Sequence, residues 1–102
     1  MYKYKATILK VIDGDTVKLK IDLGFKMYWI CNCRLAEINA PEIDSEQGKQ
    51  SKKYLSDILP IDTEIQIESI RLDKYGRPLV KIHLKDLYIN EHLIDMNYAT
   101  RQ

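Results

Sequence analysis

Two neighbouring segments of the chain alternate apolar and polar residues with a period of two, and this pattern predicts a β-hairpin. The apolar positions are Val17, Leu19, Ile21 and Leu23 in the first segment, and Met27, Trp29, Cys31, Cys33 and Leu35 in the second. Because successive side chains of a strand point to opposite faces, each set faces one side of the sheet. The residues Asp22-Leu23-Gly24 are typical of the turn between two such strands.

An earlier strand extends this hairpin to a three-stranded meander. It covers residues 2–12 and ends at Asp13-Gly14. Glycine accepts positive φ and aspartate can bond its own backbone, so this pair predicts a tight turn. Short connections of this kind join antiparallel neighbours, so the first three strands are expected to lie side by side.

A helix is expected after the meander. Apolar and small residues recur at helical spacing over residues 47–59, and the lysines between them face solvent. Asp44 or Ser45 can cap the start of this helix, and Pro60 ends it.

Two further strands and a short helix complete the pattern. Strands are predicted over residues 63–72 and 77–84, separated by a turn at residues 73–76. A second turn at residues 85–86 precedes a short helix that begins near Asn90, a residue type that favours the N-cap position.

This order of elements predicts a mainly β protein with helices, of the α+β class. Five short strands, one helix between strands 3 and 4 and a short C-terminal helix fit a five-stranded OB-type Greek-key barrel. An SH3-like barrel is the alternative, but it usually lacks a long helix between its third and fourth strands. A length of 102 residues suffices for one core, so residues 1–102 are expected to form a single domain.

Charge and hydropathy limit the classes of function. The net charge of +1 argues against a strongly basic coat for nucleic acid, although it is compatible with a local basic groove. All apolar runs are short and no signal-peptide stretch follows the N-terminal lysines, so a cytoplasmic protein without a membrane partner is predicted. Cys31 and Cys33 are interpreted as reduced core residues rather than as a disulfide or as zinc ligands.

Acids and arginines gather in four short clusters at predicted strand ends and turns. They are Asp13-Gly14-Asp15-Thr16, Arg34, Asn39-Ala40-Pro41-Glu42 and Asp73-Lys74-Tyr75-Gly76-Arg77. Each cluster alone is typical of a solvated turn or strand face. Carboxylates can hold one hard cation, and arginines can bind the oxygens of an anion through their planar guanidinium groups.

In this order and spacing the clusters resemble the staphylococcal nuclease-like (thermonuclease) family. The matching segments are residues 11–19, 34–42 and 73–77, and residues 89–91 resemble the start of a family helix. The resemblance implies an OB-type barrel, in agreement with the strand order above. It also implies a calcium-dependent nuclease that hydrolyses DNA or RNA and favours single strands.

The resemblance further implies a calcium (Ca²⁺) site. Asp15 and the backbone carbonyl of Ala40 would bind the ion, and Asp13 would lie in its outer shell. Asn39 would stand at a second ligand position, where the family commonly has aspartate. An amide oxygen can coordinate calcium but carries no charge, so weaker calcium binding is expected.

Three residues are implied as catalytic. Glu42 would hold the attacking water and act as the general base. Arg34 and Arg77 would bind the phosphate group and stabilise the transition state.

Substrate contacts are expected from two further places. Lys74 and Tyr75 match family positions that contact a nucleotide phosphate. Tyr28 and Tyr75 are candidates to stack on bases, since every base offers an aromatic face.

A catalytically inactive nuclease-like OB module that binds nucleic acid or protein is the alternative function. Asn39 favours this alternative, because it removes a charge from the implied metal site. The presence of Asp15, Arg34, Glu42 and Arg77 in one chain favours the enzyme, since a binding module has no need of the complete set.

Overall fold

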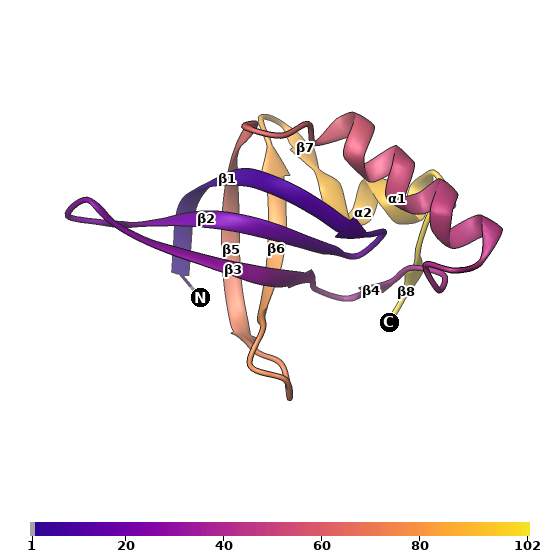
Figure 1. Cartoon of the computed structure of the whole chain (residues 1–102), viewed down its shortest axis with the longest axis horizontal. Helices are drawn as coiled ribbons and strands as arrows, with labels where there is room; N and C mark the ends of the chain where they lie inside the picture. Colours follow the sequence, from indigo (N-terminus) through magenta and orange to yellow (C-terminus); the bar gives the residue numbers. More distant parts are fainter. Residues whose placement is uncertain (1) are drawn as a thin grey trace.

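The computed structural model describes residues 2–102, and its main element is a closed five-stranded barrel (Figure 1). Its strands are β1 (Tyr2–Asp13), β2 (Thr16–Gly24), β3 (Met27–Leu35), β5 (Glu64–Leu72) and β6 (Pro78–Leu84). Neighbours pair antiparallel in the order β3-β2-β1-β5-β6, and a parallel pairing between β3 and β6 closes the sheet on itself. Together with the two helices, this arrangement confirms the predicted OB-type α+β fold.

Two helices and three very short strands complete the chain. The helices are α1 (Glu46–Ile58) and α2 (Ile89–Asp95), and the short strands are β4 (Ile38–Asn39), β7 (Leu87–Tyr88) and β8 (Thr100–Arg101). Both helices lie at the same end of the barrel (Figure 1). The pairing of β4 with β8, which was not predicted, ties the end of the chain to the segment that follows β3.

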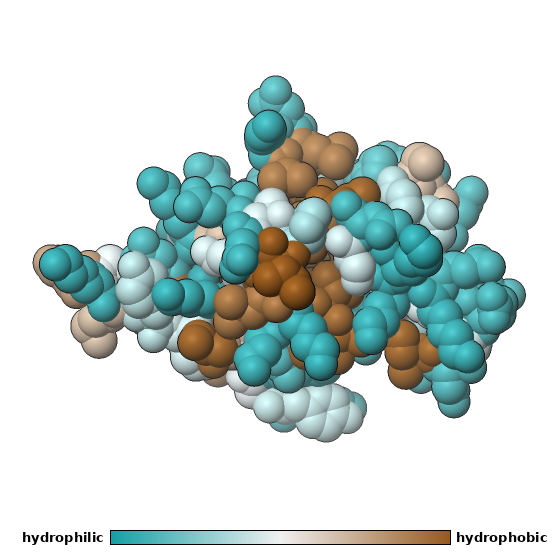
Figure 2. Space-filling model, turned by 45° about the horizontal axis from the view of Figure 1, so that its top comes forward, coloured by the Kyte–Doolittle hydropathy of each residue, from teal (hydrophilic) through white to brown (hydrophobic). Residues whose placement is uncertain are grey.

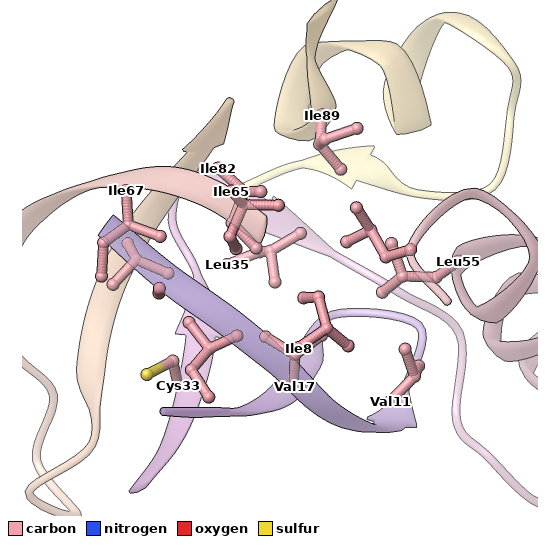
Figure 3. Packing of buried hydrophobic residues seen from close by; sticks show 14 of the residues in the cluster. Ile8, Val11, Val17, Cys33, Leu35, Leu55, Ile65, Ile67, Ile82 and Ile89 are labelled. Carbon is pink, nitrogen blue, oxygen red and sulfur yellow. The ribbon is translucent and has the colours of Figure 1, made fainter. Parts of the chain in front are cut away.

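The core fills the barrel and continues under the helices. Ile8, Val17, Leu35 and Ile82 point into the barrel, and Leu55 of α1 and Ile89 of α2 approach from outside it (Figure 3). Cys33 belongs to this core and Cys31 packs against it, both as free thiols. The predicted reduced state of the two cysteines agrees with this arrangement. None of the helices within residues 2–102 is long and apolar enough to span a membrane.

The β2–β3 hairpin projects from the barrel at the left of Figure 1. The predicted alternation continues along β3, but Met27 is 62% exposed and Trp29 is 43% exposed, because this part of the strand lies beyond the barrel. The turn also lies further along the chain than predicted. It is formed by Phe25 and Lys26, which both have positive φ, whereas β2 continues to Gly24.

Asn90 has a different function from the predicted N-cap. The N-cap of α2 is Tyr88, without a side-chain hydrogen bond, and Asn90 is buried. Its amide oxygen accepts from the backbone N–H of Ile82 at 3.0 Å, and its amide nitrogen donates to the carbonyls of Ala36 at 2.9 Å and Val80 at 3.1 Å. The cap prediction is wrong because these three buried backbone groups require partners, which Asn90 supplies from the helix side.

Candidate active site

The turn between β1 and β2 packs closely against the loop after β4. A Cβ atom at Gly14 would lie 2.8 Å from the Cβ atoms of both Ala40 and Ser51. The turn therefore needs glycine for close packing and not, as expected from the sequence, for positive φ, which Gly14 does not have. Beside it, Asp15 accepts a hydrogen bond of 2.8 Å at Oδ2 from the backbone N–H of Ala40.

Asp13 and Asp15 form a pair of carboxyl groups at this turn. Oδ1 of Asp13 accepts from the backbone N–H of Asp15 at 3.1 Å. Burial raises the pKa of Asp15, and the neighbouring Asp13 raises it further, against the lowering effects of the Ala40 N–H and of Arg34. Burial acts on Asp13 in the same direction, but its hydrogen bonds with Asp15 outweigh it and lower the pKa of Asp13. A cation near the pair would favour ionisation of both groups.

Arg34 links three segments of the chain through one guanidinium group. Its Nη1 lies 3.3 Å from Oδ2 of Asp15 and donates to the carbonyl of Ile38 at 3.2 Å. Its Nη2 donates to Oδ1 of Asn39 at 3.1 Å and to the side-chain oxygen of Gln102 at 3.3 Å. The β1–β2 turn, β4 and the residue after β8 thus meet at one arginine of β3.

Glu42 lies just before α1, and its backbone is held in place by the start of that helix. Its carbonyl accepts from the backbone N–H of Ser45 at 3.0 Å and from the Ser45 hydroxyl at 2.6 Å. Ser45, one of the two residues predicted to cap this helix, is the N-cap of α1. Its side-chain oxygen accepts a hydrogen bond from the N–H of Gly48 at 3.0 Å. A Cβ at Gly48 would overlap the carbonyl oxygen of Glu42. The Glu42 side chain is exposed, so water can reach it.

The turn from β5 to β6 holds Arg77 through Asp73. Oδ1 of Asp73 accepts from the backbone N–H groups of Tyr75 and Arg77, each at 2.9 Å, and Oδ2 lies 2.8 Å from Nε of Arg77. Burial raises the pKa of Asp73, but the hydrogen bonds from Arg77 and Tyr75 outweigh it and lower this pKa. Because Asp73 bonds Nε, both terminal nitrogens of the guanidinium are available for a bidentate contact.

Arg34 and Arg77 line the same groove, which has a volume of about 720 Å³. The parallel pairing of β3 with β6 sets Arg34 opposite Leu79, two positions after Arg77. Lys74 and Tyr75 also line the groove. The ring centre of Tyr75 lies 5.2 Å from Nζ of Lys74 and 5.4 Å from the guanidinium carbon of Arg77. The groove therefore combines four cationic side chains, Arg71 included, with one aromatic ring.

Arg34 connects two groups of the residues that the sequence singled out. The first group is Asp13, Asp15, Asn39 and Ala40, and the second is Lys74, Tyr75 and Arg77. Arg34 contacts the first group directly and lines the groove with the second. Glu42 is two residues beyond Ala40, and its side chain does not line this groove.

Several residues at the site were not singled out from the sequence. Gln102 bonds Arg34, and Arg71 lines the groove. Thr16 was named as part of its cluster but without a role, and its hydroxyl donates to Oδ1 of Asp15 at 3.1 Å. Gly48 was missed as well, although a signal was present. Glycine in a helix costs stability, so its position in the first turn of α1 indicates a close backbone contact.

The side chains near Asp15 offer oxygen atoms as potential metal ligands. Within residues 2–102 no group of three or more His, Cys, Asp or Glu side chains is arranged to hold a metal ion. The local donors are the carboxylates of Asp13 and Asp15 and the amide oxygen of Asn39, and the backbone of Ala40 adjoins them through its N–H, which bonds Asp15. These donor types fit calcium, which binds carboxylate, amide and carbonyl oxygens.

The closed barrel, the helix after β4 and the groove with its arginines define an OB-type α+β domain with a cationic groove beside an acidic turn. The chain belongs to the family of staphylococcal nuclease homologues, which matches residues 32–102. A protein of Shigella flexneri named micrococcal nuclease is 29% identical over 76 residues, which cover 74% of this chain and 40% of that protein. An uncharacterized endonuclease of Haemophilus influenzae is 31% identical over 97 residues, which cover 95% of this chain and 52% of that protein. The chain thus spans about half the length of these relatives or less.

Proposed function

We propose that residues 1–102 form a single calcium-dependent nuclease domain that hydrolyses phosphodiester bonds of DNA or RNA. The observation that carries the proposal is the position of Arg34, which contacts Asp15 and Asn39 and lines a groove together with Arg77. Membership of a nuclease family supports the same class of reaction. The fold by itself does not, because OB barrels carry many functions.

The two arginines bind the phosphate group in this proposal. A phosphodiester anion repels an approaching hydroxide, so its charge must be neutralised before water can attack. Arg77 presents its two terminal nitrogens, since Asp73 fixes its Nε at 2.8 Å. Arg34 is the second donor, and phosphate oxygens replace part of its contacts with Asn39 and Gln102.

Glu42 holds the attacking water and accepts its proton. A carboxylate in hydrogen-bond reach of the water can orient it and carry the proton away as the new P–O bond forms. The exposed side chain leaves room for that water, and the contacts of its backbone with Ser45 limit the movement of the loop.

Calcium is assigned to the acidic turn. Asp15, Asn39 and the carbonyl of Ala40 would hold it, with Asp13 in the outer shell. When bound, calcium supplies positive charge that neutralises the phosphate and polarises one of its oxygens.

The substrate lies with one phosphate against Lys74 and with a base near Tyr75. The ring of Tyr75 is exposed beside two cations, which suits a nucleotide that presents both an anion and an aromatic face. A single strand is preferred, because its unpaired bases are free to stack.

Purified protein is expected to degrade single-stranded DNA and RNA when calcium is present at millimolar concentration. An excess of the chelator EGTA stops the reaction, and added calcium restores it, because the acidic turn has too little charge to retain the ion. Gel analysis of labelled oligonucleotides measures this result. The Glu42→Gln variant, purified in the same way, reveals any contaminating nuclease. Cleavage that persists in EGTA contradicts the proposed metal dependence.

An inactive OB module that binds nucleic acid or protein is the second candidate. One observation favours it, since Asp15 is the one carboxylate among the proposed direct ligands and Asn39 beside it carries no charge. The same digestion assay separates the candidates. Oligonucleotide binding without cleavage at any calcium concentration supports the binding module.

Asn39→Asp is expected to tighten calcium binding by about tenfold, because a carboxylate replaces a neutral oxygen. Calorimetric titration with calcium measures the affinity, and the calcium concentration for half-maximal cleavage should fall in parallel. Asn97→Asp is the matched control, since Asn97 is exposed and outside the site. Equal calcium affinity of Asn39→Asp and the unchanged protein would place residue 39 outside the metal shell.

A further inference from the structure

Residues 27–33 of β3 have a strand neighbour on one side only. They pair with β2 on that side, whereas on the other side β3 pairs with β6 only at Arg34 and Leu35. No other strand within residues 2–102 lies along this second side. About half of the backbone N–H and C=O groups of the stretch point toward it. We call residues 27–33 the free edge of β3, and it belongs to the hairpin that projects from the barrel (Figure 1).

The free edge lacks the features that usually prevent an edge strand from pairing with another chain. Its sequence is Met-Tyr-Trp-Ile-Cys-Asn-Cys, without a charged residue, a proline or a glycine. Its register with β2 shows no bulge between Tyr28 and Cys33. Natural proteins protect exposed edges with lysines, prolines, bulges or a covering segment. Uncharged segments of this length that are rich in aromatic and β-branched residues pair readily when they are exposed. A covering strand is therefore expected.

Apolar side chains are exposed on both faces of the free edge. Met27 and Trp29 lie on one face and Tyr28 and Ile30 on the other, and all four are 43–62% exposed. Phe25, in the turn of the hairpin, is 99% exposed. Figure 2 shows apolar side chains beside hydrophilic ones on the projecting end of the hairpin, at the left. Since an aromatic side chain has an area of 150–250 Å², these five side chains together expose on the order of 600 Å².

An apolar pocket with a volume of about 180 Å³ adjoins the free edge. Trp29 of the free edge lines it together with Leu23 of β2, and Leu72 of β5 and Pro78 of β6 line it from across the barrel. Arg71 is the one charged residue among those that line it. A cavity of about 150 Å³ can hold a benzene ring, so this pocket has room for one aromatic or aliphatic side chain from another chain.

We infer that the free edge pairs antiparallel with the free edge of a second copy of this chain and forms a dimer with two-fold symmetry. An uncharged edge that is placed antiparallel to itself is self-complementary, because backbone donors meet acceptors and no like charges meet. The exposed apolar area approaches the roughly 800 Å² that each partner contributes to a stable interface, and the paired backbones add to it. Each copy has one free edge, so the assembly closes as a dimer. The inference is independent of the proposed nuclease function.

Sedimentation velocity between about 1 and 100 μM protein tests the dimer, since interfaces of this size bind with micromolar or higher affinity. The dimer should predominate at the upper end. Amide hydrogen exchange at both ends of the range locates the interface, and the free edge should exchange at least about tenfold more slowly in the dimer because new backbone bonds protect it. A monomer at every concentration overturns the inference and leaves the edge to an extended segment of a different protein. A dimer with unchanged exchange at the free edge, or an assembly larger than a dimer, also overturns it.

Ile30→Glu and Met27→Glu place a charge on opposite faces of the free edge. Ile30 lies opposite Lys20 in the β2–β3 register, so the folded monomer accommodates an acid there. Each variant is expected to raise the dissociation constant of the dimer by at least about tenfold, because pairing brings the charges of the two copies together and removes water from them. Ile61→Glu is the matched control, since Ile61 is 69% exposed in the loop after α1, and its dissociation constant should not change. Thermal unfolding identifies the variants that are folded, and a folded edge variant that dimerises like the unchanged protein would show the inference to be wrong.

Discussion

Glu42→Gln is expected to lower kcat by about 10²- to 10⁴-fold, the range that a positioned general base contributes. The amide has nearly the same shape as the carboxylate, so the loop keeps its contacts with Ser45 and Gly48. Binding of the oligonucleotide should remain within about twofold, because the change removes proton acceptance and leaves Arg34 and Arg77 in place. The variant therefore separates the handling of water from the binding of phosphate.

Single-turnover cleavage in saturating calcium measures the rate, and anisotropy with the same oligonucleotide measures the affinity. Glu46→Gln is the control, because Glu46 is an exposed glutamate four positions away in the first turn of α1. It should cleave at the rate of the unchanged protein. Full activity of Glu42→Gln would show that another group, or water alone, accepts the proton.

The barrel could be predicted from the sequence because its signals are local. Alternation over residues 15–35 depends only on which face of each strand meets the core. In the structure β3 has the expected bounds, and β2 begins within one residue of its expected start but ends later than expected, at Gly24. The helix before Pro60 could be predicted for the same reason, since the helical spacing of its apolar residues and its Ser45 cap are both local signals.

Features that depend on distant partners could not be predicted in this way. Asn90 looked like a helix cap, and only the folded barrel brings Ala36 and Val80 to its amide group. Gly14 looked like a turn glycine, yet its need for a small side chain comes from Ala40 and from α1. The strands β4 and β8 have two residues each, too few to show an alternation of apolar and polar residues, and they form because they pair with each other.

The candidate site, like the fold, could be predicted only in part. The sequence indicated which residues belong to it, because acids and arginines at turns stand out against an apolar pattern. Their mutual contacts could not be predicted in full, since the pairing of β4 with β8 is what brings Gln102 beside Arg34. The resemblance to a known family supplied the order in which the clusters belong together, and the contacts of Arg34 supply a physical reason for it.

Arg77→Ala is expected to reduce kcat/KM by about 10³-fold or more, the effect of losing an arginine that stabilises charge on a transferring phosphoryl group. Asp73 holds Nε of Arg77 at 2.8 Å and its backbone N–H at 2.9 Å, so the guanidinium is fixed before substrate arrives. A donor that is already in position loses little entropy when the charge develops, which increases its effect in the transition state. The same argument predicts that Arg77→Lys recovers little activity, because a lysine ammonium cannot bond Asp73 and two phosphate oxygens in one plane.

Cleavage rates at subsaturating oligonucleotide measure this loss, and thermal unfolding shows whether the turn remains folded. Arg101→Gln is the control, since Arg101 is an exposed arginine whose Nη2 bonds Glu91 at 2.7 Å on the surface. Its rate should stay within about twofold of the unchanged protein, as expected for the loss of a solvent-exposed ion pair. A comparable fall in both arginine variants would mean that net charge, and not the position of Arg77, limits the reaction. Rescue of Arg77→Ala by added guanidinium, with no effect on Arg101→Gln, would identify the missing group as the planar cation that Asp73 holds.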